Sequence, residues 1–147
     1  MLRRITVRGI AIHNDHLLCV RQKSYKDHKN NYWNLPGGGL ENKESLTDCL
    51  TRELLEETGV KAVIGNLLYV QQFVYGDTDY LEFFFNILNS SKFINIDLSK
   101  TTHGELEIDE IAFIKTSNNT VLPKFLDIKD IQKKIKHNTS PSIYSYY

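Results

Sequence analysis

Short stretches rich in β-branched and aromatic residues recur along the chain, and several alternate between apolar and polar positions, which predicts strands with one buried face. The predicted strands cover residues 4–12, 16–22, 67–74, 80–88 and 110–115. Asn14-Asp15 is a turn signal between the first two, so we expect these two strands to form a hairpin. Gly76-Asp77 marks another turn, between the third and fourth strands.

Two stretches have helical spacing instead. In the first, Ser45 is a suitable N-cap, Asp48 completes a capping-box pattern, and Gly59 can take the left-handed conformation that ends a helix. Its apolar face would comprise Leu46, Cys49, Leu50 and Leu54. The second helix is expected to open at Pro123, because proline suits the first turn of a helix. Its buried stripe would comprise Phe125, Ile128, Ile131 and Ile135.

The predicted order is strands, helix, strands, helix. This order indicates an α+β fold, a layered α/β/α sandwich around a mixed sheet. The chain has 147 residues, which suits a single domain covering residues 1–147. Residues 137–147 are polar and aromatic without a clear period, so we expect a loosely ordered tail.

Composition narrows the classes of function. Eighteen Lys and Arg residues balance eighteen Asp and Glu residues, which disfavours a protein that coats nucleic acid or binds membranes through a basic surface. Cys19 and Cys49 lie in apolar stretches, and we expect buried free thiols that suit a reducing cytoplasm. No apolar run has the length of a membrane span, and the N-terminus lacks the apolar core of a secretion signal. We therefore expect a cytoplasmic protein with no membrane partner.

Three glutamates gather at the end of the first predicted helix. Glu53, Glu56 and Glu57 are related by i, i+3 and i+4, so their carboxylates project from one side. The helix dipole disfavours negative charge at this end by roughly 0.3–1 kcal/mol each, and a solvated face would favour Lys or Arg there. Crowded carboxylates repel one another unless a cation lies between them. Hard oxygen ligands of this kind suit Mg²⁺ or Mn²⁺.

These glutamates belong to a longer pattern. Gly38 is followed after five residues by Glu44, and after seven more by Arg52-Glu53-Leu54-Leu55-Glu56-Glu57-Thr58-Gly59-Val60. The pattern resembles the signature of the Nudix family, Gly-x5-Glu-x7-Arg-Glu-U-x-Glu-Glu-x-Gly-U, in which U is aliphatic. No fixed position departs from it, and Trp33-x-Leu35-Pro36-Gly37-Gly38 is a common lead-in. The resemblance in motif covers residues 33–60.

The resemblance implies a Mg²⁺-dependent hydrolase that cleaves the pyrophosphate bond of a nucleoside diphosphate derivative by attack of water at phosphorus. The implied metal ligands are Glu53, Glu56, Glu57 and the backbone carbonyl of Gly37. Arg52 would fix the direction of a neighbouring carboxylate. Glu44 would lie further out or reach the metal through water.

Members of this family differ in which carboxylate takes the proton from the attacking water, so this assignment stays open. One candidate is Glu53 on the helix. Later candidates are Glu105, Glu107 and Glu110. Of these, Glu105 and Glu107 are favoured, because His103-Gly104 indicates a loop just before the strand.

The signature does not distinguish substrates, since it would touch only the phosphates and the metal that they share. Nucleotide sugars such as ADP-ribose, dinucleoside polyphosphates, nucleoside triphosphates and capped RNA ends stay open, although neutral net charge disfavours long RNA. Residues 23–31 and 73–79 are expected to form loops that select among them. The alternative function is a non-catalytic Nudix domain that binds a nucleotide for regulation. The oligomeric state also stays open, a homodimer included.

A few other side chains are candidates for substrate contact. Arg8, Arg21 and Lys23 could face the phosphates from the first strands. The aromatic candidates for stacking on a base are Tyr32, Trp33, Tyr69, Phe73 and Tyr75, although strand aromatics usually belong to the core. Glu82 interrupts an apolar stretch, and we expect it at an outward-facing position.

Overall fold

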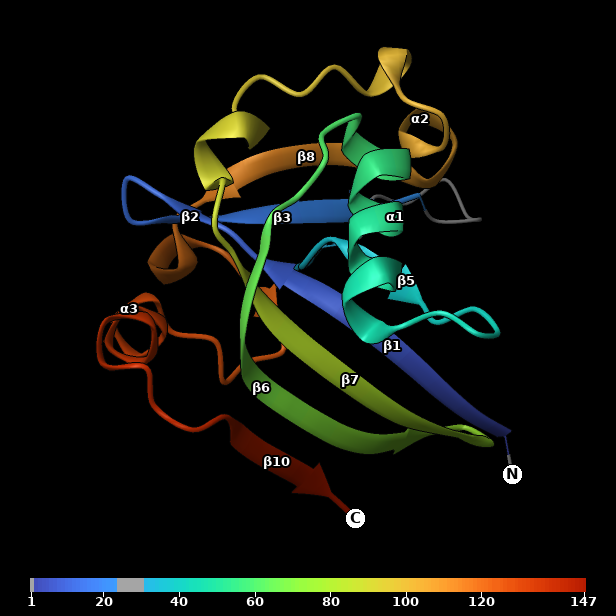
Figure 1. Ribbon diagram of the computed structural model, residues 1–147, viewed down its shortest axis with the longest axis vertical. Helices are drawn as coiled ribbons and strands as arrows, with labels where there is room; N and C mark the ends of the chain where they lie inside the picture. Colours follow the sequence, from blue (N-terminus) through green and yellow to red (C-terminus); the bar gives the residue numbers. More distant parts are fainter. Residues whose placement is uncertain (1, 24–30) are drawn as a thin grey trace.

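The computed structural model describes residues 2–23 and 31–147. Two β-sheets lie between helix α1 (Leu46–Thr58) on one side and helix α3 (Ile128–His137) on the other (Figure 1). This confirms the predicted α+β fold with α/β/α layers in one domain. None of the helices in these residues is long and apolar enough to cross a membrane.

The first sheet is mixed and has the strand order β10-β6-β7-β1-β5. The second sheet has the strand order β2-β3-β4-β9, and β8 also pairs with β3. The first sheet comprises β1 Leu2–Ile10, β5 Gly37–Gly39, β6 Ile64–Tyr75, β7 Thr78–Ile87 and β10 Ser142–Tyr146. The second comprises β2 Ile12–His13, β3 His16–Gln22, β4 Trp33–Asn34, β8 Ile108–Ile114 and β9 Val121–Leu122. Four short helical segments are η1 Ser90–Phe93, η2 Leu98–Lys100, α2 Gly104–Glu107 and η3 Thr116–Asn118.

The chain changes sheets between β1 and β2. Strand β1 pairs antiparallel with β5 and parallel with β7, so the expected hairpin is confined to the end of the first predicted strand, where Ile12 pairs with Leu17. The turn at Asn14-Asp15 joins the short strand β2 to β3. Because side chains alternate along β1, Val7 packs on the α1 side of the sheet and Ile10 packs on the α3 side.

Helix α1 begins and ends where the sequence predicts. The Asp48 N–H donates to Oγ of Ser45 at 3.0 Å. Gly59 adopts a φ of 76° and donates its N–H to the Leu55 carbonyl at 2.9 Å. The helix packs into a buried cluster of Val7, Ala11, Leu18, Cys49, Leu50, Leu54, Ala62, Phe85, Ile87 and Phe93. This packing fixes the direction in which the opposite face of α1 presents its acidic side chains.

Helix α3 starts five residues later than the sequence predicts. Its N-cap is Asp127, whose side chain accepts the N–H of Asp130 at 3.0 Å. Pro123 instead lies in the turn that follows β9. Ile131 is fully buried as expected, whereas Ile135 is 41% exposed and lies outside the buried stripe.

The end of the chain forms a strand, where the sequence pattern indicated a loose tail. Strand β10 pairs in parallel with β6. The ring of Tyr144 stacks on Phe125 with 4.2 Å between centroids, and both rings pack against the core on the α3 side. That core comprises Ile10, Leu17, Cys19, Trp33, Leu35, Leu68, Tyr69, Phe84, Val121, Leu126 and Ile131.

Candidate active site

Strand β5 brings a run of glycines against the acidic face of α1. Gly38 lies opposite Val7 of β1 in the antiparallel pair. A Cβ at Gly38 would lie 2.3–2.5 Å from the carboxylate atoms of Glu53, so glycine lets this carboxylate reach the backbone. At Gly37 the φ is +143° and a Cβ would lie 2.0 Å from the Val7 carbonyl oxygen. That position therefore excludes any side chain.

Arg52 connects the acidic residues at the centre of the site. Its Nε donates to Oε1 of Glu44 at 2.7 Å, and its Nη2 donates to Oε2 of Glu44 at 3.1 Å. Its Nη1 donates to Oε1 of Glu53 at 3.0 Å and to Oε2 of Glu56 at 3.3 Å. Nη2 also donates to the Gly39 carbonyl at 3.1 Å. These hydrogen bonds fix three carboxylates around one guanidinium, and they lower the pKa of the Glu44 carboxyl to about 2.

Glu57 is the most buried of the three helix glutamates, with 5% of its surface exposed. Its Oε2 is buried and has no hydrogen-bond partner among the residues that the structure describes. Its pKa is raised to about 8, first by burial and then by the negative charge of Glu53. The pKa of Glu53 is also raised, mainly by burial. In both cases burial disfavours the charged form of the carboxyl group, which a bound cation would favour.

One cleft of about 780 Å³ is lined by Glu53, Glu56 and Glu57 together with the glycines of β5. Arg4 and Arg8 of β1 line the same cleft. The structure thus brings together all four groups that the resemblance assigns to metal binding, Gly37 included.

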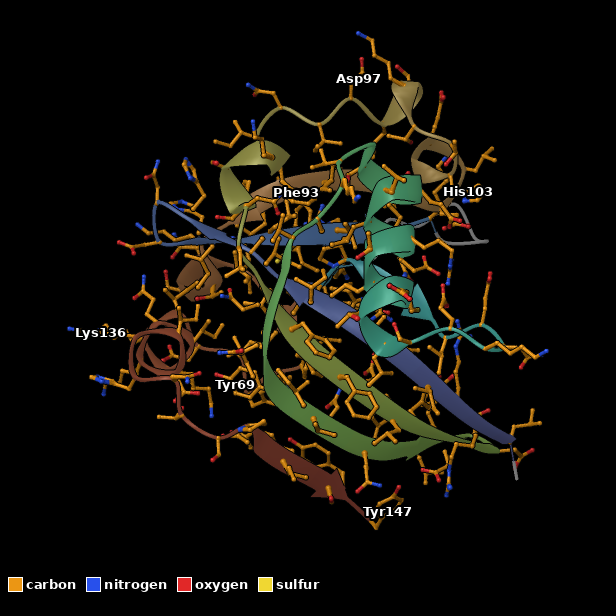
Figure 2. All side chains as sticks on the ribbon, viewed as in Figure 1. Tyr69, Phe93, Asp97, His103, Lys136 and Tyr147 are labelled. Carbon is orange, nitrogen blue, oxygen red and sulfur yellow. The ribbon has the colours of Figure 1, made fainter. Side chains whose placement is uncertain are left out.

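The segment before β8 packs against the C-terminal end of α1. The His103 N–H donates to the Glu56 carbonyl at 3.0 Å, and its Nδ1 lies 3.1 Å from Oε2 of Glu56. A Cβ at Gly104 would lie 2.3 Å from the Glu57 carbonyl oxygen. Figure 2 shows His103 beside this end of α1, next to the short helix α2. The His103 N–H thus satisfies the Glu56 carbonyl near the end of α1, and the glycine at position 104 lets the chain pass close to the Glu57 carbonyl.

Glu105 and Glu107, the two residues favoured in the sequence for accepting the proton of the attacking water, line different surfaces. Glu107 lines the acidic cleft, and its charge raises the pKa of both Glu53 and Glu57. Glu105 instead lines a different groove, of about 590 Å³, together with Glu110. The sequence could not separate these residues, because the turn of α2 sends neighbouring side chains to different surfaces.

The three basic residues expected to face the phosphates do not all lie at the cleft. Arg8 and Lys23 line the cleft. Arg21 lies elsewhere, because its Nη1 is 3.4 Å from Oε1 of Glu110 and its guanidinium lies 4.3 Å from the centroid of the Trp33 ring. Residues 24–30 of the loop expected to select substrates lie outside the described residues.

A second cavity of about 490 Å³ adjoins the cleft, and Arg4, Arg8 and Gln22 line both. Its aromatic lining comprises Tyr32, Phe73, Tyr75, Tyr80 and Phe84. Three of the five aromatic candidates from the sequence are therefore here, whereas Trp33 and Tyr69 are core residues. Nothing in the sequence pattern singled out Tyr80. Tyr80 lies opposite Phe73 on the paired strand, and the two rings stack with 4.9 Å between their centroids. Only the strand register reveals this pairing.

Glu82 was expected to face outward, and this was wrong. It is 8% exposed and receives hydrogen bonds from Thr6, Arg8 and Gln71. Its partners are on neighbouring strands, so the residues adjacent to it in sequence gave no sign of them.

The donor set fits a divalent cation. Three observations favour positive charge at this point. Glu57 has an oxygen without a partner among the described residues, and the pKa values of Glu53 and Glu57 are raised. The glycine backbone of β5 also lies close to the Glu53 carboxylate. Among residues 2–23 and 31–147, no group of three or more His, Cys, Asp or Glu side chains is already arranged to hold a metal ion. Arg52 and His103 hold the carboxylates of Glu53 and Glu56 in the conformation described.

Comparison with known sequences identifies the family of this chain. The NUDIX domain profile matches residues 2–138, so the chain belongs to the Nudix family. The uncharacterized Nudix hydrolase YvcI of Bacillus subtilis (strain 168) is 26% identical over 116 residues, which are 78% of this chain and 70% of that protein. The 8-oxo-dGTP diphosphatase of Proteus vulgaris is 33% identical over 60 residues, which are 41% of this chain and 54% of that protein.

Solved structures show the same fold. The solution structure of the E. coli ORF135 protein superposes with a TM-score of 0.71 at 16% identity, covering 95% of this chain and 96% of that chain. An ADP-ribose pyrophosphatase from Streptococcus suis 89-1591 superposes with a TM-score of 0.59 at 14% identity, covering 96% and 98%. At these identities the likeness concerns the fold alone.

Proposed function

We propose that this chain hydrolyses the pyrophosphate bond of a nucleoside diphosphate-X substrate with Mg²⁺, or Mn²⁺ in its place. Glu53, Glu56, Glu57 and the Gly37 carbonyl would hold the metal. The observation that carries the proposal is the buried Glu57 carboxylate, which shares the cleft with two more helix glutamates and keeps an oxygen without a partner among the described residues. When bound, a divalent ion neutralises phosphate oxygens and lowers the pKa of a coordinated water.

The chain's own residues would divide the remaining work. Arg52 donates hydrogen bonds to Glu53 and Glu56, so it limits the directions that these carboxylates can take. Glu107 lines the cleft from α2, and we assign it as the group that accepts the proton of the attacking water. Such a base typically contributes about 10²–10⁴-fold to the rate. Glu105 faces another groove and has no part in this assignment.

The substrate would span both cavities. Its phosphates would lie in the acidic cleft beside Arg4 and Arg8, and the nucleoside would extend into the aromatic cavity. Nucleotide sugars, dinucleoside polyphosphates and nucleoside triphosphates all present this combination of charge and flat ring. Pyrophosphatases of nucleotides occur among the similar proteins, as in the 8-oxo-dGTP diphosphatase and the ADP-ribose pyrophosphatase.

The test is a screen of phosphate release over these three substrate classes, coupled to a phosphatase, or to a pyrophosphatase for triphosphates. Turnover by the wild type that EDTA abolishes, and that Glu57→Gln lowers by about 10²-fold or more, supports the proposal. Nucleotide binding by calorimetry without metal-dependent turnover of any substrate would instead support a regulatory binding domain. Wild-type rates in Glu57→Gln would overturn the assigned metal site.

A further inference from the structure

Three buried polar side chains form a row across the first sheet. The register places Thr6 of β1 opposite Glu82 of β7, and places Glu82 opposite Gln71 of β6. Their exposed fractions are 2%, 8% and 6%. The neighbouring rows of β6 and β7 on this face carry aromatic rings, namely Tyr69, Phe73, Tyr80 and Phe84. Burying a carboxylate among rings is costly unless it is hydrogen-bonded or paired with a cation, so the partners of Glu82 indicate its role.

Both carboxylate oxygens of Glu82 are occupied by protein donors. Gln71 Nε2 donates to Oε1 at 2.7 Å. Thr6 Oγ1 donates to Oε2 at 2.8 Å, and Arg8 Nε donates to the same oxygen at 3.1 Å. Glu82 is therefore not poised to bind a ligand itself. Of its three partners, Arg8 is the one that borders both the acidic cleft and the aromatic cavity and carries a charge.

The guanidinium of Arg8 is held from two directions. Its Nε side faces Glu82, and its Nη1 donates to the carbonyl oxygens of Leu35 and Gly37, both at 3.3 Å. The hydrogen bonds of Arg8 within residues 2–23 and 31–147 involve Nε and Nη1 and leave Nη2 without a partner there. Because the guanidinium is planar and rigid, fixing these two nitrogens also fixes the direction of the remaining N–H groups.

We propose that Glu82 is a positioning residue that aims Arg8 at the phosphate joining the two parts of the substrate, one in the acidic cleft and one in the aromatic cavity. This inference rests on the proposed function, because it needs a phosphate at the boundary between the cavities. Thr6 and Gln71 hold the Glu82 carboxylate, and the carboxylate holds Arg8. A freely rotating arginine would still attract a phosphate, but it would bind more weakly, because its side chain would lose conformational freedom on binding.

The decisive variant is Glu82→Gln, which keeps the size of the side chain and removes its charge. We expect KM to rise about tenfold with kcat within about twofold, because Arg8 would grip the substrate and the transition state alike. Arg8→Lys keeps the charge without the planar fork and should raise KM similarly. In the Arg8→Lys background, Glu82→Gln should add little, because both changes remove the same interaction.

A matched control exists on the same strand. Asp79 of β7 is 7% exposed and pairs with Arg3 of β1 at 2.7 Å. Its side chain points to the opposite face from Glu82, since the two residues are three positions apart on one strand. Asp79→Asn should leave KM unchanged even if it lowers the melting temperature. Titration with Mn²⁺, followed by electron paramagnetic resonance, should give the same affinity in Glu82→Gln as in the wild type.

A spectroscopic measurement reports on Arg8 without turnover. In ¹⁵N-labelled protein, the Nε–H signal of Arg8, assigned from its loss in Arg8→Lys, should shift and exchange faster in Glu82→Gln, and should stay unchanged in Asp79→Asn. An unshifted, slowly exchanging signal in Glu82→Gln overturns the positioning role. So does an active Glu82→Gln enzyme with wild-type KM, or an equal rise of KM in Asp79→Asn. A wild type that hydrolyses no substrate overturns the proposed function, and the resonance test then still decides whether Glu82 positions Arg8.

Discussion

Glu53 and Gly38 are in direct contact, with the carboxylate of Glu53 filling the space that a Cβ at position 38 would take. The φ of Gly38 is not in the left-handed region, so backbone freedom does not explain this glycine. What explains it is proximity, because the carboxylate lies against the backbone of β5 at 2.3–2.5 Å from the Cβ position. The contact sets how near the acidic face of α1 comes to the Gly37 carbonyl.

Gly38→Ala is therefore expected to displace Glu53 while leaving the fold intact. The new Cβ would clash with the carboxylate end of the Glu53 side chain, which can turn away. We therefore expect the free energy of unfolding to fall by only about 1–2 kcal/mol. Binding of Mn²⁺ should weaken by about tenfold or more, because one carboxylate would leave its place. Calorimetric titration with Mn²⁺ and urea denaturation together measure both effects.

Gly39→Ala is the control for this substitution. A Cβ at Gly39 would meet nothing closer than Nη2 of Arg4, at 3.6 Å, which is ordinary contact. Its affinity for Mn²⁺ should match the wild type within about twofold, which is under half a kcal/mol. Equal weakening in both variants would show that any side chain on β5 disturbs the site, and that the contact with Glu53 has no special role.

The pairing of Glu44 with Arg52 should make stability depend on acid pH. The pKa of Glu44 is lowered from 4.5 to about 2, first by its hydrogen bond from Arg52. A lowered carboxyl pKa stabilises the fold above pH 4.5, and this contribution is lost as pH falls from 4.5 through 2. Glu44→Gln should therefore cost about 1 kcal/mol at pH 7 and much less near pH 2, as measured by urea denaturation at each pH.

Glu41 supplies the comparison for Glu44. Its carboxylate lies 3.7 Å from Nη1 of Arg52, and its side chain is 69% exposed. Glu41→Gln should change stability by less than about 0.5 kcal/mol at either pH, because an exposed pair at this distance contributes little. A Glu44→Gln variant whose deficit persists undiminished at pH 2 would contradict the assigned linkage.

Local features of the site could be predicted from sequence, because local chemistry determines them. The N-cap Ser45 and the end of α1 at Gly59 depend on residues within a few positions. The common direction of Glu53, Glu56 and Glu57 follows from the helical repeat once the helix is granted. All three indeed line one cleft.

Features set by distant partners could not be predicted in this way. Strand β10 exists because β6 offers it an edge, and its own sequence shows no strand period. Glu82 is buried because Arg8 and Gln71 reach it from other strands. The placement of Glu107 depends on contacts between the segment around His103 and the end of α1. In each case the deciding contact joins residues that are far apart in sequence or on different strands.

The different surfaces of Glu105 and Glu107 give a direct kinetic test. Glu107→Gln should lower kcat by about 10²–10⁴-fold, because the amide cannot accept the proton of the attacking water. Glu105→Gln changes the same charge two positions away, in another groove, and should keep kcat within about twofold. Rates with the preferred substrate at saturating Mg²⁺ measure both. If Glu107→Gln retains full activity, the base must be sought elsewhere, with Glu53 as the next candidate.

Removal of the metal should be visible in thermal stability. The buried carboxylate of Glu57, which has one oxygen without a partner among the described residues, favours a bound cation. Mg²⁺ at about 100 times its dissociation constant should therefore stabilise the fold by about 2.7 kcal/mol. For a chain of this size, that corresponds to a rise in melting temperature of about 5–10 °C over the protein in EDTA. Glu57→Gln should lose most of this rise, because the amide removes the charge that the cation offsets. Glu105→Gln should retain the whole rise, since its side chain lines another groove. A full Mg²⁺-dependent rise in Glu57→Gln would mean that the ion binds away from the buried carboxylate.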